Sequence, residues 1–158
     1  MCLVGEQTKS SGFVGCISTV SNRSTTKPEA FRWFWAWGPA IVQMAVIFVL
    51  SGIPNLKELP GGISDFTGHF AGYMILGALV VRAAAGARWA GVNVRAAARA
   101  WLISAAYGVS DEFHQSFVPG RSPSGVDWIA DATGAAAAVV AIAVVASFVR
   151  RRRKGREV

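Results

Sequence analysis

The chain has 158 residues, of which 53% are hydrophobic and only 16% are charged. Soluble domains usually have about 25% charged residues, and the apolar residues here fall into four long blocks. The composition therefore excludes a disordered chain, a small disulfide framework and an ordinary soluble enzyme. It predicts an integral membrane protein with one domain.

The positive charge, +7 overall, is concentrated at the end of the chain. Six basic residues follow the last apolar block: Arg150, Arg151, Arg152, Arg153, Lys154 and Arg156. A basic cluster directly after a membrane segment is typical of contact with anionic lipid. We therefore expect the lipid bilayer, and no nucleic acid, as the partner. Cys2 and Cys16 have neither paired nor metal-binding spacing, so we expect no disulfide from them.

The apolar blocks predict four transmembrane helices at about 33–53, 66–85, 97–118 and 126–149. Each has near the ~20 residues needed to cross the hydrocarbon of a bilayer, and backbone groups in lipid must pair within the segment. The predicted fold class is therefore all-α, an integral membrane bundle of four transmembrane helices. We divide the chain into a flexible polar tail (1–30), the helical domain (31–149) and a basic cytoplasmic tail (150–158).

Basic residues are unevenly distributed between the two sides of this bundle. The stretch up to Arg32, the connection between the second and third helices with its flanks, and the C-terminal tail have four, four and six Lys and Arg residues. The other two connections have one each, Lys57 and Arg121. Because Lys and Arg favour the cytoplasmic side, we expect both termini in the cytoplasm and a multi-pass protein of the bacterial plasma membrane.

Acidic residues are distributed in the opposite way. Six of them lie in the predicted outer connections or the outer halves of the helices: Glu58, Asp65, Asp111, Glu112, Asp127 and Asp131. This asymmetry predicts that any polar site lies at the outer face of the membrane.

The start of the second helix carries the first group of polar residues. Asp65, His69 and Tyr73 are spaced i, i+4 and i+8 and share one face. Ser64 or Asp65 caps the start of this helix, where an acid also suits the helix dipole. For Asp65, that structural role and a role in a functional site fit equally well. His69 either pairs with Asp65 or belongs to a functional site. Gly68 and Gly72 form a GxxxG pattern, which favours close packing of helices.

The end of the third helix carries the second group. Tyr107, Asp111, His114 and Gln115 share one face, and Glu112 lies about a sixth of a turn away. Two adjacent acids near a helix C-terminus oppose the helix dipole, and such breaches of local preference are expected at functional sites. We favour that interpretation over an early loop in which both acids are in water.

The start of the fourth helix carries the third group. A capping-box pattern explains Asp127, whereas Asp131, one turn later, has no capping role and should face the bundle interior with a partner. Arg121 is the natural cation to hold Asp127 or Glu112. The small residues 134–138 should pack tightly against a neighbouring helix.

These groups predict one polar cluster that unites the three helices at the outer level. Its members are Asp65, His69, Tyr73, Tyr107, Asp111, Glu112, Gln115, Arg121 and Asp127. Such a cluster could bind a cation, exchange protons or hold a polar head group. A metal is only weakly indicated, because HExxH and zinc-ligand spacings are absent, and we expect neither a metal nor a cofactor. Nucleophilic serine, phosphate-loop and nucleotide motifs are also absent from the sequence.

The cluster residues carry a family resemblance. The segment DEFHQSFVPGR at 111–121, with Tyr107, Gly108, Ser124, Asp127 and Gly134 around it, closely resembles the signature of the VanZ-like family. Asp65, His69, Phe70 and Tyr73 resemble the second motif of that family. The resemblance covers about residues 41–148. The chain departs from the family at two positions: Phe66 stands where a lysine is usual, and Asp131 where an asparagine is common.

The resemblance implies a small multi-helix bacterial membrane protein. The founding member of the family is associated with low-level resistance to the glycopeptide antibiotic teicoplanin, and its mechanism is not established.

Four hypotheses for the function of the polar cluster remain open. The cluster binds or modifies a cell-envelope component, such as a lipid-linked wall precursor, a lipid head group or the glycopeptide. It is a membrane enzyme in which His69 or Glu112 acts as general base near Arg121. The cluster belongs to a transporter subunit, which would have to form a homo-oligomer because four helices are too few to enclose a transport pathway. Or it only holds the bundle together.

Overall fold

The computed structural model describes residues 29–54, 58–59 and 62–156. Four long helices make up most of this part: α1 (Glu29–Ser51), α2 (Asp65–Ala84), α3 (Val94–Gln115) and α4 (Gly125–Lys154). Their bounds agree with the predicted helices to within a few residues, except that α4 continues through Lys154. The all-helical prediction is therefore confirmed. The predicted flexible tail lies almost entirely outside the described residues.

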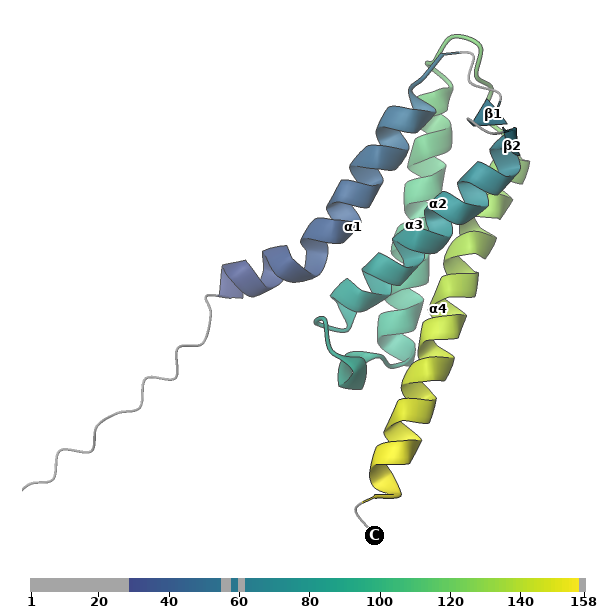
Figure 1. Ribbon diagram of the computed structural model, residues 1–158. Helices are drawn as coiled ribbons and strands as arrows, with labels where there is room; N and C mark the ends of the chain where they lie inside the picture. Colours follow the sequence, from purple (N-terminus) through teal and green to yellow (C-terminus); the bar gives the residue numbers. More distant parts are fainter. Residues whose placement is uncertain (1–28, 55–57, 60–61, 157–158) are drawn as a thin grey trace, which may run out of the picture.

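Successive helices run in alternating directions (Figure 1). The α1–α2 connection contains two short antiparallel strands, β1 (Glu58–Leu59) and β2 (Ile63–Ser64), which the sequence did not predict. We call this end, with the α3–α4 connection, the hairpin end. The opposite end contains the start of α1, the 3-10 helix η1 (Trp89–Gly91) and the end of α4, and we call it the basic end.

Three of the four helices, α1, α2 and α4, are long and apolar enough to cross a membrane. Their outward surfaces support this, because large apolar side chains such as Phe34, Val49, Val140 and Phe148 are exposed to the surroundings. In α3, four charged residues lower the hydropathy: Arg95, Arg99, Asp111 and Glu112. Its 22 residues span about 33 Å, so α3 is long enough, and its membrane crossing stays a prediction.

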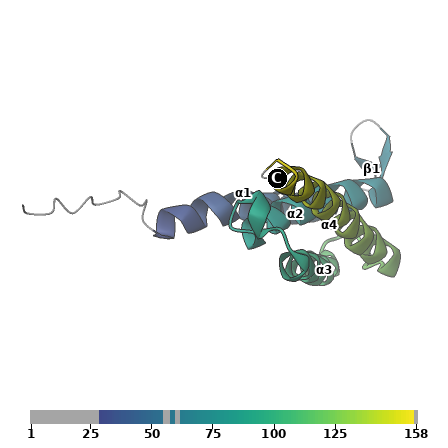
Figure 2. The same cartoon turned by 90° about the horizontal axis from the view of Figure 1, so that it is seen from below.

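Helix α2 lies at the centre of the bundle and contacts the other three helices (Figure 2). Its closest approach is to α4, where a Cβ added at Gly77 would lie 2.9 Å from the Cα of Ala135. A Cβ added at Gly134 would collide with the backbone carbonyl of Phe70. The tight packing predicted for the small residues of α4 is thus confirmed. Gly72 of the GxxxG pattern is less crowded, since its added Cβ would lie 3.9 Å from Ile47.

Helix ends and bends follow local chemistry. The hydroxyls of Ser64 and Ser124 accept hydrogen bonds from the backbone N–H groups of Thr67 and Asp127, so both serines cap the helices that follow them, as predicted. Helix α1 contains Pro39, which removes a backbone donor, and α1 changes direction along its length (Figure 1). The part of α1 nearer the hairpin end therefore lies against α2 and α3.

Candidate functional site

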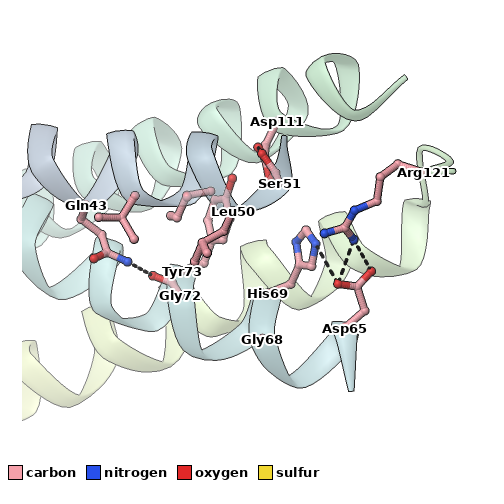
Figure 3. Close-up of a pocket in the computed structure, with 12 residues that line it drawn as sticks. Gln43, Leu50, Ser51, Asp65, Gly68, His69, Gly72, Tyr73, Asp111 and Arg121 are labelled. Carbon is pink, nitrogen blue, oxygen red and sulfur yellow. Dashed lines mark hydrogen bonds and ion pairs between the residues drawn. The ribbon is translucent and has the colours of Figure 1, made fainter. Parts of the chain in front are cut away.

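A pocket opens at the hairpin end between α1, α2 and α3 (Figure 3). Its lining residues are Gln43, Val46, Ile47, Leu50, Ser51, Asp65, Gly68, His69, Gly72, Tyr73, Asp111 and Arg121. The cavity volume is about 80 Å³, which is room for several water molecules. Apolar side chains of α1 form one wall, and charged or polar side chains of the other elements form the rest.

His69 is held from behind by Asp131, a residue of α4. Its Nδ1 lies 2.9 Å from Oδ1 of Asp131, and the Asp131 side chain is completely buried. Its Nε2 lies on the other side of the ring, 3.9 Å from Oδ1 of Asp65 and 3.5 Å from Nε2 of Gln115. The predicted contact of His69 with Asp65 is therefore present, but it is longer than the contact of His69 with Asp131. The arrangement fixes the ring and leaves Nε2 toward the pocket.

Arg121 reaches from the α3–α4 connection to the first turn of α2. Its Nη1 donates to both carboxylate oxygens of Asp65, at 3.0 and 2.8 Å. The prediction that Arg121 would hold Asp127 or Glu112 was wrong. Glu112 accepts a 2.6 Å hydrogen bond from the backbone N–H of Ser124 instead. A sequence cannot show these partners, because they depend on where the turn after α3 leads.

The two adjacent acids of α3 have separate partners. Asp111 accepts a 2.6 Å hydrogen bond from the hydroxyl of Ser51 in α1 and a 3.4 Å bond from Nε2 of Gln115. Glu112 faces α4 instead, through Ser124. Both carboxyl groups are buried and α3 continues to Gln115. The alternative of an early loop with both acids in water is therefore wrong.

Two tyrosines lie side by side beneath the pocket, with ring centroids 6.2 Å apart. Tyr107 donates a 2.7 Å hydrogen bond to the backbone carbonyl of Met44 in α1. The Tyr73 hydroxyl is buried and finds no hydrogen-bond partner among the described residues. His114 lies apart from these groups, because its ring stacks on Phe48 with centroids 4.0 Å apart. Tyr107 thus has a structural role that the sequence could not separate from a role in the site.

Asp127 contributes in two ways. Its backbone N–H donates to the capping hydroxyl of Ser124, and its carboxylate lies beside Asp65 and His69. Asp65, His69 and Asp127 each offer one donor atom, and these three atoms lie within 4.8 Å of one another. The structure therefore brings together the acids of α2 and α4 as the sequence predicted. It also brings in the acid of α4 that the predicted cluster omitted, Asp131.

The sequence model of the VanZ/LLP1 family matches residues 16–146, which is most of the chain. The chain belongs to this family. Neither a curated protein nor a solved structure gives a significant match. The resemblance drawn from the motifs of α2 and α3 is thus confirmed, and the match begins upstream of the predicted coverage.

The two departures of this VanZ-like protein from the family pattern have different settings. Phe66 is 45% exposed on the surface of α2, so an apolar side chain meets the surroundings there. Asp131, by contrast, is fully buried and bonded to His69. Asp131 therefore lies inside the cluster, whereas Phe66 lies on the outer surface of α2.

Two side chains that the sequence analysis did not include complete this VanZ-like site. Ser51 fixes Asp111 from the end of α1. Gln43 lines the pocket, and its Nε2 donates a hydrogen bond of 3.2 Å to the backbone carbonyl of Gly72. A lone serine or glutamine in an apolar block gives no periodic signal. Asp131 did give one, as an acid inside a span without a capping role.

Proposed function

We propose that this protein binds the polar group of an amphiphilic cell-envelope component in the pocket at the hairpin end, on the outer side of a bacterial plasma membrane. The observation that carries the proposal is the composition of the pocket. Val46, Ile47 and Leu50 form an apolar wall, and the ion pair of Asp65 and Arg121 lies beside it. A lipid-like molecule has the same two kinds of surface, a hydrocarbon chain and a charged head.

Arg121 is the residue that we expect to meet an anionic head group. Its guanidinium is planar and always charged, and it suits phosphate and carboxylate groups. The guanidinium is nearly buried, and its Nε has no hydrogen-bond partner among the described residues. The small cavity volume favours entry of one charged group, with the rest of the ligand along the apolar wall of α1. A lipid-linked wall precursor, a phospholipid or the acyl-bearing glycopeptide teicoplanin fits this description.

The placement of the pocket on the outer side is supported by the distribution of basic residues. The basic end contains Arg88 and Arg150, whereas Arg121 is the sole Lys or Arg at the hairpin end within the described residues. Lys and Arg favour the cytoplasmic side. Family membership adds a reason to test glycopeptides, because the founding VanZ is associated with teicoplanin resistance.

A second candidate function is catalysis at the same pocket. The pair of Asp131 and His69 favours it, because a carboxylate on one ring nitrogen orients the imidazole and strengthens the other nitrogen as a general base. Asp65 and Arg121 lie on the side of that second nitrogen. In this case the bound envelope component would be modified as well as held.

Growth of a glycopeptide-susceptible Gram-positive host tests the proposal. Wild type, Arg121→Gln and an empty vector are compared at matched membrane levels, with teicoplanin, vancomycin and an unrelated antibiotic. We expect wild type to protect selectively and Arg121→Gln to lose the protection. Arg88→Gln at the basic end is the matched control and should protect like wild type. Equal growth of all strains would contradict the link to glycopeptides, and equal protection by Arg121→Gln would remove the pocket from the mechanism.

The side of the membrane is tested by labelling with a maleimide that does not cross membranes. In a background with Cys2→Ser and Cys16→Ser, Ser122→Cys near the pocket should react in intact cells. Arg88→Cys at the basic end should react only after the cells are opened. The reverse pattern would place the pocket in the cytoplasm and contradict the proposed location.

A further inference from the structure

Three buried donor groups converge behind the pocket, one from each of three helices. His69 of α2, Glu112 of α3 and Asp131 of α4 each offer one donor atom, and these atoms lie within 4.8 Å of one another. The three residues are far apart in the sequence, so no ligand spacing marks them. They combine an imidazole nitrogen with two carboxylate oxygens.

The two carboxylates have hydrogen-bonding capacity that the chain does not use. Asp131 is 0% exposed and Glu112 is 8% exposed. Each has one oxygen bonded, to His69 and to the backbone of Ser124, respectively. Oδ2 of Asp131 and Oε1 of Glu112 have no hydrogen-bond partner among the described residues. A buried acceptor without a partner costs about 1–3 kcal/mol, so these oxygens indicate a ligand.

The charge of the cluster favours a cation as that ligand. Five acids of α2, α3 and α4 gather around this group: Asp65, Asp111, Glu112, Asp127 and Asp131. Arg121 pairs with one of them, and His69 can supply one more positive charge. The group then still has a formal charge of −3. Like charges repel strongly where water is excluded, and a divalent cation would relieve that repulsion.

The backbone around Asp131 makes room for its carboxylate. A Cβ added at Gly108 of α3 would lie 2.9 Å from Oδ2 of Asp131. A larger residue at position 108 would therefore push against the unpaired oxygen. Gly108 and Glu112 lie one turn apart on α3, so the same helix that makes room for Asp131 also supplies Glu112.

We propose that His69, Glu112 and Asp131 bind one divalent transition-metal ion, Zn²⁺ or Mn²⁺. Imidazole nitrogen with carboxylate oxygen suits these ions better than Mg²⁺ or Ca²⁺, which prefer oxygen alone. Such ions bind these donors at ~2.0–2.2 Å, so the donor atoms need to move only slightly to share one. The ion replaces the proton between Nδ1 of His69 and Oδ1 of Asp131.

Metal content of the purified full chain tests this proposal directly. The protein is prepared in detergent with a tag other than polyhistidine, stripped with EDTA, and titrated with Zn²⁺, Mn²⁺, Mg²⁺ and Ca²⁺ separately. We expect one Zn²⁺ or Mn²⁺ per chain, bound more tightly than Mg²⁺ or Ca²⁺, and a higher Tm in its presence. In the Mn²⁺ form, electron spin-echo spectroscopy should detect coupling to an imidazole nitrogen. Wild type that binds neither ion stoichiometrically overturns the proposal.

Substitutions then locate the ion. Glu112→Gln and Asp131→Asn should weaken binding by roughly 100-fold or more, since loss of even an outer neighbour of a metal costs ~10–100-fold. Asp111→Asn is the matched control, because Asp111 is also buried in α3 but is bonded to Ser51 outside the donor group. Because Asp111 contributes only its charge and no donor atom, this variant should weaken binding much less than either test variant. Unchanged affinity in both test variants overturns the proposal, and so does an equal loss in Asp111→Asn. These readouts need no envelope ligand, so the proposed function can fail while the metal site stands.

Discussion

The two halves of α2 meet their neighbours in different ways. Toward the hairpin end, Asp65 and His69 contact other elements through charged or polar atoms. Further along, Gly77 and Val80 pack against neighbouring helices by shape, with backbone close to backbone at Ala135. The first half leaves the buried hydroxyl of Tyr73 without a partner among the described residues, whereas the second half makes its closest contacts through backbone and apolar atoms. We therefore expect close packing to contribute more to the stability of the bundle than the polar contacts do, and we expect the polar contacts to serve a function.

The largest change in stability is expected from a substitution in α4 that faces the first half of α2 at Phe70. Gly134→Ala should lower the free energy of unfolding by about 3 kcal/mol or more, because the new methyl collides with the backbone of Phe70 and a helix must move. Unfolding in mixed micelles of detergent and denaturant measures the change. Gly125→Ala in α4 is the control, since nothing beyond its chain neighbours and its own helical turn lies within 4 Å of the added Cβ, and no proline follows it. It should be neutral or stabilise the helix by up to ~1 kcal/mol. Equal loss in both variants would refute the packing argument.

A smaller loss of stability is expected at the hydrogen bond between α1 and α3. Ser51→Ala removes the 2.6 Å donor to the buried Asp111 and should cost about 1–3 kcal/mol. The control is Ser110→Ala, because among the described residues the Ser110 hydroxyl bonds to the carbonyl of Tyr107 in its own helix and to no other helix. That change should stay within about 0.5 kcal/mol. If Ser51→Ala proves just as mild, Asp111 does not depend on α1, and the polar half contributes even less to stability.

The two tyrosines give a matched pair. Tyr107→Phe loses the hydrogen bond to Met44 and should cost about 1 kcal/mol. Tyr73→Phe removes a buried hydroxyl that lacks a partner among the described residues, and it should leave stability unchanged or slightly raised. Thermal unfolding of both variants in the same detergent provides the comparison. A clear loss of stability in Tyr73→Phe would show that its hydroxyl is bonded in solution, for example to water in the pocket.

The smallest change in stability is expected at the ion pair. Arg121→Gln should alter the free energy of unfolding by less than about 1 kcal/mol, because Asp65 is about one-third exposed and stays hydrated without its partner. The same variant is expected to lose protection against teicoplanin. The combination of normal folding and lost activity would place function in the polar half. Loss of folding would instead support the hypothesis that the polar residues only hold the bundle together.

Local sequence signals were enough to predict the helices and their order. They were also enough to single out the acids of α2, α3 and α4 as candidate site residues. Apolar blocks of membrane length and the capping serines are local signals, so they could be recognised without neighbours. The predicted convergence of Asp65, His69 and Asp127 followed from their common level in alternating helices. The family resemblance followed from the motifs in α2 and α3.

The tertiary structure decided the partners. Arg121 holds Asp65 rather than Asp127 or Glu112, and Asp131 holds His69, because the turn after α3 and the close contact of α2 with α4 set those distances. Ser51 entered the cluster only through its place beside Asp111. Periodicity tells which face of a helix a side chain occupies. It does not tell which neighbour lies opposite, since that depends on helix separation and rotation, and here these are set by the glycine and alanine contacts between α2 and α4.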